Sequence, residues 1–301
     1  MLKSLAHVFL AGWGCLPLCL MPVLARSLGL AMAAGRFRRR DIDRHLGWAF
    51  PEMGAAERQR LRRQVYDHFA ALVVECLCLP SLSAAELQKR CRIHNLHLVQ
   101  ERLAAREGFF ALAAHVGNWE LGLAALAEQG YPAHAVVKEI KGQFGQALVE
   151  RMRGVHGIGM IMRGENAGRQ ILSVLKQGRV VGFVLDQNMT ADEGVFVDFF
   201  GRPACTMPGL AVLASRSRVP VFPIRFERDP DGYHHDIWIL PPVAWEEQPT
   251  REAAILHNTW RYTQAIEAMI RACPAQWLWM HRRWKTQPEP ATASQRSGSQ
   301  P

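Results

Sequence analysis

Several reactive-site patterns are missing from this 301-residue sequence. It has no Gly-x-Ser-x-Gly nucleophile elbow and no local signature of a reactive cysteine, so no motif supports a covalent serine or cysteine mechanism. Gly157-Ile158-Gly159 lacks the rest of a dinucleotide-binding fingerprint, which leaves a Rossmann-type cofactor site unsupported. Zinc-finger spacing, an RNP-type aromatic signature and a lysine-rich block are also missing, and this argues against a nucleic-acid partner.

The cysteines do not form a disulfide framework. Seven of them, an odd number, are scattered through apolar surroundings, which indicates reduced packing residues of a cytosolic compartment. One cluster could supply soft metal ligands, but its spacing matches no zinc module, so we expect no metal site. The cluster consists of Cys76, Cys78, Cys91, His94 and His97.

Length and charge limit the possible class of this protein and its possible partners. A chain with 49% hydrophobic residues can bury one large core, and a catalytic domain with an N-terminal appendage fits this length. The formal net charge of +9 predicts attraction to polyanions. Since nucleic-acid motifs are missing, an anionic membrane surface or a phosphorylated substrate is the favoured partner.

The N-terminal 35 residues predict a membrane anchor. Residues 5–24 are apolar apart from His7 and are long enough to cross a hydrocarbon core of about 30 Å. Pro17 and Pro22 would kink such a helix, so a tilted, broken or interfacial helix is also compatible. A cleaved signal peptide is the alternative, with a small-residue site at residues 31–33. The arginines that follow, between residues 36 and 40, favour the cytoplasmic side of an inner membrane and contact with anionic headgroups.

The chain is organised around a central stretch from Gly108 to Glu120. An apolar run ends at His115, Gly117 and Asn118 break it, and apolar residues then recur at helical spacing. The pattern predicts a strand, a tight turn and a helix. His115 then lies at the carboxyl end of a buried strand, where α/β sheets hold their ligands, with Asn118 as a candidate N-cap.

His115 and Glu120 are the candidate catalytic pair. From the first helical turn, the Glu120 carboxylate could reach one imidazole nitrogen of His115, fix its tautomer and leave the other nitrogen free to accept a proton. Without a covalent nucleophile in the sequence, this base would activate a hydroxyl of a substrate. The alternative is a histidine that is merely hydrogen-bonded at a strand end.

The sequence from Ala114 to Glu120 resembles a known family. A His-x-x-x-x-acid motif is the hallmark of the glycerolipid acyltransferase superfamily, and Ala-His-x-Gly-Asn-Trp-Glu is similar to the late lipid A acyltransferases, the lauroyl and myristoyl transferases. Three more blocks extend the resemblance over roughly residues 36–286. They begin at Phe50-Pro51-Glu52-Met53, at Asp186-Gln187 and at Pro274.

Other candidate binding residues end predicted strands. Lys138 and Arg163 each follow a short apolar strand, and Asp186-Gln187 follows the buried run at residues 180–185. Asp186 and Gln187 would then face the same crevice as His115, although they could equally only cap a turn. The resemblance implies a cation near Lys138, for a phosphate or the thioester, and an acceptor or acyl pocket near Asp186. Backbone amides at Gly117 and Asn118, with Lys138 or Arg163, are candidates for an oxyanion site.

The remaining pattern predicts an α/β fold with a mixed, largely parallel sheet flanked by helices. Helices are expected over residues 57–79 and 250–271, an amphipathic piece over 83–102, and a hairpin at the sheet edge over 219–240. The tryptophans after Pro274 suit either an interfacial belt or a loop around the substrate. An acyltransferase domain would thus span 36–286, with a disordered tail at 287–301.

These observations favour a membrane-associated O-acyltransferase. The resemblance implies a fatty acyl chain carried as a thioester, on acyl carrier protein or coenzyme A, and a hydroxyl of a lipid A precursor as acceptor, with no cofactor. Acylation of a lysophospholipid or a phosphoinositide mannoside, or non-catalytic lipid binding, are the alternatives.

Overall fold

The fold is built on a seven-stranded sheet with the order β1-β9-β8-β2-β5-β3-β4. The computed structural model describes residues 2–140 and 142–289, so Lys141 and most of the predicted tail lie outside it. Five of the six strand pairings are parallel, and only β8 and β9 are antiparallel, which confirms the mixed, largely parallel sheet. The strands are β1 (Cys91–His94), β2 (Phe110–Ala113), β3 (Ala133–Val137), β4 (Gly159–Met162), β5 (Val180–Val184), β8 (Val221–Arg228) and β9 (His235–Ile239).

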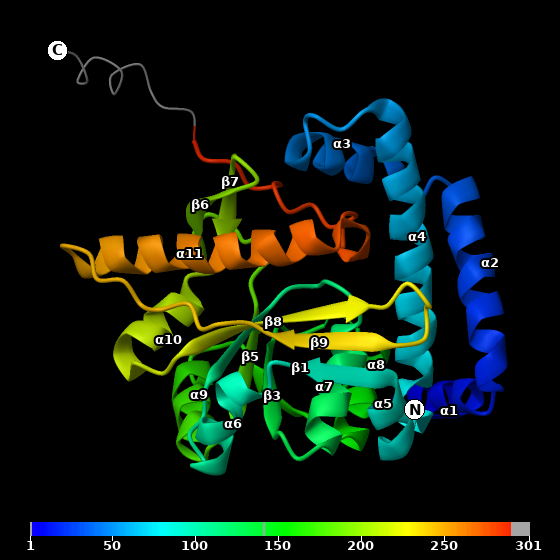
Figure 1. The fold of residues 1–301 in the computed structure, drawn as a ribbon, viewed down its shortest axis with the longest axis horizontal. Helices are drawn as coiled ribbons and strands as arrows, with labels where there is room; N and C mark the ends of the chain where they lie inside the picture. The colour runs from blue at the N-terminus through cyan, green and yellow to red at the C-terminus, as the bar shows by residue number, and fades with distance from the viewer. Residues whose placement is uncertain (1, 141, 290–301) are drawn as a thin grey trace.

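Helices cover both faces of this sheet, and a two-stranded hairpin, β6 (Val195–Phe199) with β7 (Arg202–Thr206), stands beside α11 (Figure 1). The long α4 stands at one side with α2 along its outer surface (Figure 1). The helices are α1 (Leu2–Gly14), α2 (Met21–Ala34), α3 (Arg39–Ala49), α4 (Ala55–Cys78), α5 (Ala84–Arg90), α6 (His97–Ala104), α7 (Trp119–Glu128), α8 (Gln143–Val155), α9 (Ala167–Lys176), α10 (Gly209–Ser217) and α11 (Arg251–Ala272).

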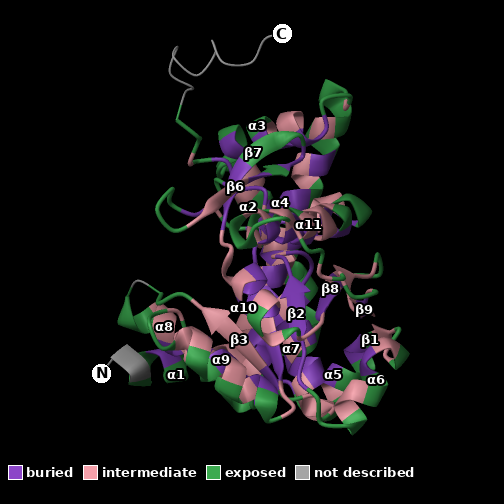
Figure 2. Cartoon of the chain, turned by 90° about the vertical axis from the view of Figure 1, so that its left-hand side faces the viewer, coloured by how far each residue is buried: buried purple, intermediate pink, exposed green. Residues whose placement is uncertain are grey.

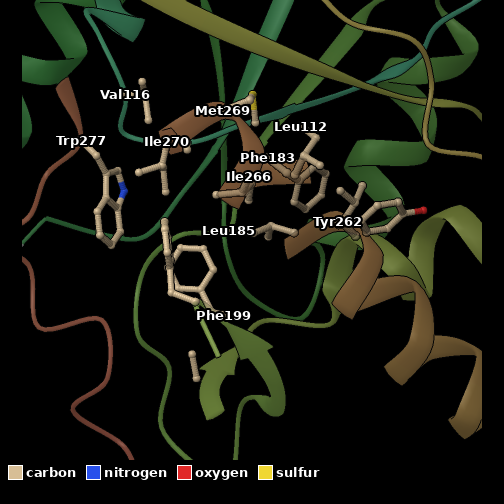
Figure 3. Close-up of a cluster of buried hydrophobic side chains, with 14 of the residues drawn as sticks. Leu112, Val116, Phe183, Leu185, Phe199, Tyr262, Ile266, Met269, Ile270 and Trp277 are labelled. Atoms are coloured by element: carbon tan, nitrogen blue, oxygen red, sulfur yellow. The ribbon is translucent and has the colours of Figure 1, made fainter. Parts of the chain in front are cut away.

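Alternation along β2 divides the core into two clusters. Phe110 and Leu112 belong to the cluster with α3, α4 and α11, whereas Ala111 and Ala113 belong to the one under α5, α6 and α7. Figure 3 shows side chains of α11 facing Leu112 and its neighbours on the sheet. In Figure 2 the central strand β2 is buried and β3 is of intermediate burial, with exposed helix surfaces outside them. Both faces of β2 are therefore packed, which holds the strand that leads to the site in place.

The N-terminal helix is broken, as its prolines predict: α1 ends at Gly14, and a 3₁₀ turn at Leu18–Leu20 precedes α2. Among the described residues, no single helix has both the length and the hydropathy to cross a membrane. The pair Ser4–Gly14 and Leu18–Ala34, bent by 89°, meets those two criteria only when taken together.

Two sequence predictions about the fold were wrong. The amphipathic piece at residues 83–102 contains a strand, β1, which pairs in parallel with β9 some 140 residues later. Because β1 covers β9, the β8–β9 hairpin is not at the sheet edge. For the tryptophans after Pro274 two alternatives were open, and burial argues against the interfacial belt, since Trp277, Trp279 and Trp284 are each at most 4% exposed.

Candidate active site

A tight turn joins β2 to α7 and carries His115 two residues beyond the end of the strand. Gly117 has a φ of +64°, and a Cβ there would lie 2.2 Å from the carbonyl oxygen of Phe226, so only glycine fits. Asn118 caps α7 by accepting a hydrogen bond at Oδ1 from the Leu121 amide (3.0 Å). The predicted strand, turn and helix are confirmed.

The Asp186 carboxylate holds His115 from the end of the neighbouring strand β5. His115 Nδ1 lies 2.8 Å from Asp186 Oδ1, and the His115 amide donates to Asp186 Oδ2 at 3.0 Å. Trp277 Nε1 donates to the same Oδ2 at 2.7 Å. Three donors thus fix a carboxylate whose side chain is only 2% exposed.

The charges at this pair determine the tautomer of the imidazole. Burial alone would raise the pKa of Asp186, but the positive charge of a protonated His115 and the hydrogen bonds from His115 and Trp277 outweigh it and lower the pKa to about 2. An ionised carboxylate only accepts hydrogen bonds, so the imidazole proton sits on Nδ1 and Nε2 is left as an acceptor. Burial would lower the pKa of His115, but the negative charges of Asp186 and Glu120 raise it overall.

Glu120 was predicted to hold the imidazole of His115, but its carboxylate contacts other side chains. The Glu120 carboxylate accepts two hydrogen bonds from Arg153 on α8, from Nε at 2.9 Å and from Nη2 at 2.6 Å. Trp119 Nε1 donates a third at 3.0 Å. Glu120 therefore anchors a buried arginine beside His115, and Asp186 makes the contact that was expected of Glu120.

Arg153 is a buried cation with one donor left over. Its residue is 9% exposed, and Nη1 has no hydrogen-bond partner among the described residues although it is buried. Arg153 lines the cavity that opens at His115, and its positive charge by itself lowers the pKa of His115. A buried, unsatisfied guanidinium N–H costs free energy unless a ligand binds it.

The cavity at His115 has a volume of about 440 Å³. Gln187, Lys138 and Arg163 line it, as do Glu120 and Arg153. Gln187 Nε2 lies 3.4 Å from His115 Nε2, Lys138 is exposed, and Arg163 approaches Glu193 at 3.7 Å. In the described part of the chain, no group of three or more His, Cys, Asp or Glu side chains could hold a metal ion.

Gly117 and Asn118, which were predicted to bind substrate, are not among the residues that line this cavity. The Gly117 amide donates to the carbonyl of Gln276 at 3.0 Å, so it is not free for an oxyanion. Both polar atoms of the Asn118 side chain are also occupied, because Nδ2 donates to Glu75 Oε2 at 2.6 Å. These two residues shape the turn.

A buried ion pair supports the turn from behind. Glu75 of α4, 6% exposed, binds Arg228 of β8 through both carboxylate oxygens, and Arg228 Nη2 lies 2.6 Å from Oε2. His68 Nε2 lies 3.3 Å from the carbonyl oxygen of Gly117. The charge of Arg228 outweighs burial and holds the pKa of Glu75 well below its usual range. The turn is therefore tied to α4 and β8 as well as to the sheet.

A narrow apolar slot adjoins the catalytic cavity between the sheet and helices α6 and α7. It shares Trp119, Arg153, Ala135 and Val184 with that cavity, and Ala111 and Leu123 lie deeper in its lining. Its volume is about 80 Å³, whereas one water molecule needs roughly 10–15 Å³ on the same measure.

Sequence reasoning missed three residues of this arrangement. Arg153 lies in a helix whose charges were expected to be solvated, and Trp277 lies in the C-terminal block whose role stayed open. Glu75 alone gave a local signal, because a carboxylate within Val73-Val74-Glu75-Cys76-Leu77 needs a buried partner.

Comparisons with known proteins agree with this picture. The family model of bacterial lipid A biosynthesis acyltransferases matches residues 1–286. The chain is 26% identical to the lipid A biosynthesis lauroyltransferase of Escherichia coli (strain K12), over 89% of this chain and 87% of that protein. It is 26% identical to the palmitoleoyltransferase (92% and 88% covered) and 25% identical to the myristoyltransferase (88% and 80% covered) of the same strain.

Proposed function

Because this chain belongs to the bacterial lipid A biosynthesis acyltransferases, we propose that it transfers a fatty acyl chain from a thioester to a hydroxyl of a lipid A precursor. The observation that carries the mechanism is the His115–Asp186 pair, which leaves His115 Nε2 as an acceptor in a residue that lines a cavity. The cations Lys138 and Arg163 in the same lining suit a phosphorylated acceptor.

The reaction follows from the tautomer. His115 Nε2 takes the proton of the acceptor hydroxyl while the oxygen attacks the thioester carbonyl carbon, and Asp186 stabilises the imidazolium that forms. When the tetrahedral intermediate collapses, the carbon–sulfur bond breaks and the thiolate leaves. The imidazolium returns its proton to that sulfur, so His115 ends in its starting state.

Arg153 is the group best placed to stabilise the oxyanion. Its Nη1 is a buried donor without a partner in the described chain, and Glu120 fixes the guanidinium through the other two nitrogens. A preorganised donor in a dry site stabilises developing negative charge more strongly than water does. In this account Glu120 acts through Arg153.

The acyl tail takes the apolar slot beside Arg153. The two cavities meet at Trp119 and Arg153, so a thioester carbonyl near His115 directs its chain between α7 and the sheet. Each methylene buried there contributes about 0.8 kcal/mol. The donor is an acyl carrier protein thioester, for which the basic net charge of +9 is the supporting feature, and coenzyme A is the competing donor.

The protein associates with the cytoplasmic face of an inner membrane through its N-terminal helices. Of the fourteen large apolar side chains exposed in the described part of the chain, eight lie in the first 37 residues. Val8 is 70% exposed and Val23 is 59% exposed. Exposed apolar side chains next to an arginine cluster are typical of a helix at a bilayer surface.

A donor and acceptor panel tests this function. The purified protein is offered acyl carrier protein and coenzyme A thioesters with tetra-acylated and penta-acylated lipid A precursors, and with a lysophospholipid and a phosphoinositide mannoside. We expect transfer to a lipid A precursor from the carrier-protein thioester. Transfer only to another lipid, or lipid binding without turnover of any donor, would contradict the proposal.

A further inference from the structure

A second, larger cavity lies where residues 35–44, the α2–α3 link and the start of α3, meet residues 282–285; we call these the N-terminal arm and the C-terminal segment. Its volume is about 870 Å³, and it shares no lining residue with the catalytic cavity. Five arginines between residues 36 and 44 line it together with Arg282 and Lys285, against two carboxylates, Asp41 and Asp43. We call this cavity the basic hollow.

Some of these charges hold the hollow together. Asp41 binds Arg38 at 3.4 Å and Arg282 at 3.2 Å, which ties the N-terminal arm to the C-terminal segment. These hydrogen bonds outweigh burial and lower the pKa of Asp41. The aromatic part of the wall is also fixed, because Trp48 and Trp284 meet edge to face at 5.7 Å.

Other charges are left over. Arg36, Arg40 and Lys285 are exposed and make no ion pair with any described residue. Three cations converging on one cavity without a carboxylate partner repel each other, and an anion between them relieves this repulsion. Guanidinium groups match the oxygens of a phosphate in charge and in geometry.

The arm itself is held in an unusual conformation. Arg36 and Arg38 have φ values of 53° and 51°, in the left-handed region that costs an L-residue roughly 1–2 kcal/mol. Tyr66 Oη donates to the carbonyl of Phe37 at 2.8 Å and secures the arm against α4. Phe37, between the two arginines, is 47% exposed. An exposed aromatic ring beside unpaired cations suits the boundary between lipid headgroups and acyl chains.

We infer that the basic hollow binds the phosphate of an anionic phospholipid of the bilayer, held by Arg36, Arg40 and Lys285. This inference rests on the membrane association proposed above. A bilayer lipid is favoured over the acceptor because the catalytic cavity has its own cations, Lys138 and Arg163. The lipid would orient the protein on the membrane without taking part in the reaction.

Vesicle sedimentation of the full chain tests this site. One variant combines Arg36→Gln, Arg40→Gln and Lys285→Gln. The control variant combines Arg169→Gln, Lys176→Gln and Arg216→Gln, which removes the same charge from exposed positions of α9 and α10, at the opposite end of the molecule from α3 (Figure 1). Each protein is mixed with phosphatidylglycerol-containing vesicles or with phosphatidylcholine vesicles.

We expect the hollow variant to bind phosphatidylglycerol vesicles about 100-fold more weakly than the wild type, and the control to change far less. Acyl transfer to a detergent-dispersed acceptor should be unchanged in both. Equal losses in the two variants, or equal binding by the wild type and the hollow variant, would overturn the inference. A raised KM for the dispersed acceptor in the hollow variant would also overturn it, since it would make the hollow an acceptor site.

The vesicle assay and the donor and acceptor panel together separate this inference from the proposed function. If the wild type transfers no acyl chain but the hollow variant alone loses vesicle binding, the proposed function fails and the inference stands. If the wild type binds neither kind of vesicle, membrane association and the inference fail together.

Discussion

Replacing Asp186 by asparagine probes the contact on which the mechanism depends. Asparagine keeps the shape of the side chain, but only one of its two terminal atoms accepts hydrogen bonds. In the wild type, the His115 amide and Trp277 Nε1 both donate to Oδ2, while His115 Nδ1 faces Oδ1. An asparagine satisfies the two donors by placing its oxygen there, which turns its NH₂ toward Nδ1.

That orientation inverts the tautomer. His115 Nδ1 would accept from the asparagine NH₂, so the ring proton would move to Nε2, the atom that must accept the substrate proton. The corresponding change in a serine-protease triad lowers kcat about 10⁴-fold, and we expect Asp186→Asn to lower it by roughly 10³- to 10⁴-fold. Loss of the carboxylate also removes a charge that favours the imidazolium.

The pH dependence gives a second, independent readout. The base works when it is unprotonated, so kcat/KM of the wild type should fall as the pH drops through the raised pKa of His115. Without Asp186 the imidazolium is less stable and that pKa falls, so the residual activity of Asp186→Asn should persist to lower pH. The assay is steady-state acyl transfer across a pH series, with circular dichroism as the folding control. A folded variant with wild-type kcat, or with an acid limb that does not move, would refute the reasoning.

Three further predictions concern the residues around this pair. Arg153→Met should lower kcat about 10²- to 10³-fold with a smaller change in KM, because it removes an oxyanion donor; a change in KM alone would assign Arg153 to ground-state binding. Glu75→Ala should lower the free energy of unfolding by about 3–5 kcal/mol in urea titrations, because it leaves the Arg228 charge, whose side chain is only 10% exposed, without its partner; a loss below about 1 kcal/mol would show that the pair is solvated. Ala111→Leu should shift the preferred donor toward shorter acyl chains in a chain-length series, because it fills the slot about two residues, roughly 6–7 Å, below the end of β2; an unchanged profile would place the acyl tail elsewhere.

The local pattern around His115 predicted its surroundings well. A short apolar run, a glycine and an asparagine cap encode the strand, the turn and the helix within about fifteen residues, and the structure has all three. The fold class followed from strands alternating with helices. The apolar runs before Lys138, Arg163 and Asp186 are also parallel strands of one sheet in the structure. Each run could be recognised because a turn and a helical pattern, or polar residues, follow it.

The partner of His115 could not be read from spacing. Glu120 lies five residues away in the sequence, but its direction is set by Arg153, which α8 brings in 33 residues later. Asp186 reaches His115 because β5 pairs with β2, and strand order is a property of the whole sheet. β1 was not predicted for the same reason. Four residues carry little local signal, and their partner β9 is about 140 residues distant.

The charges of the N-terminal arm show another limit of sequence reasoning. A cluster of arginines predicts attraction to anions, but it does not say which of them are already paired. Only the fold brings Arg282 to Asp41, 241 residues apart in the sequence, and Lys285 to the same cavity. The fold shows which cations of the basic hollow are already paired, and the unpaired ones are those that we propose as phosphate contacts.

The most direct test of the central claim is the acyl-transfer rate of purified His115→Ala with saturating donor and acceptor. If the imidazole Nε2 is the general base, the rate should fall by at least about 10²-fold, while the circular dichroism spectrum and vesicle binding match those of the wild type. A folded His115→Ala protein that turns over at the wild-type rate would contradict the account.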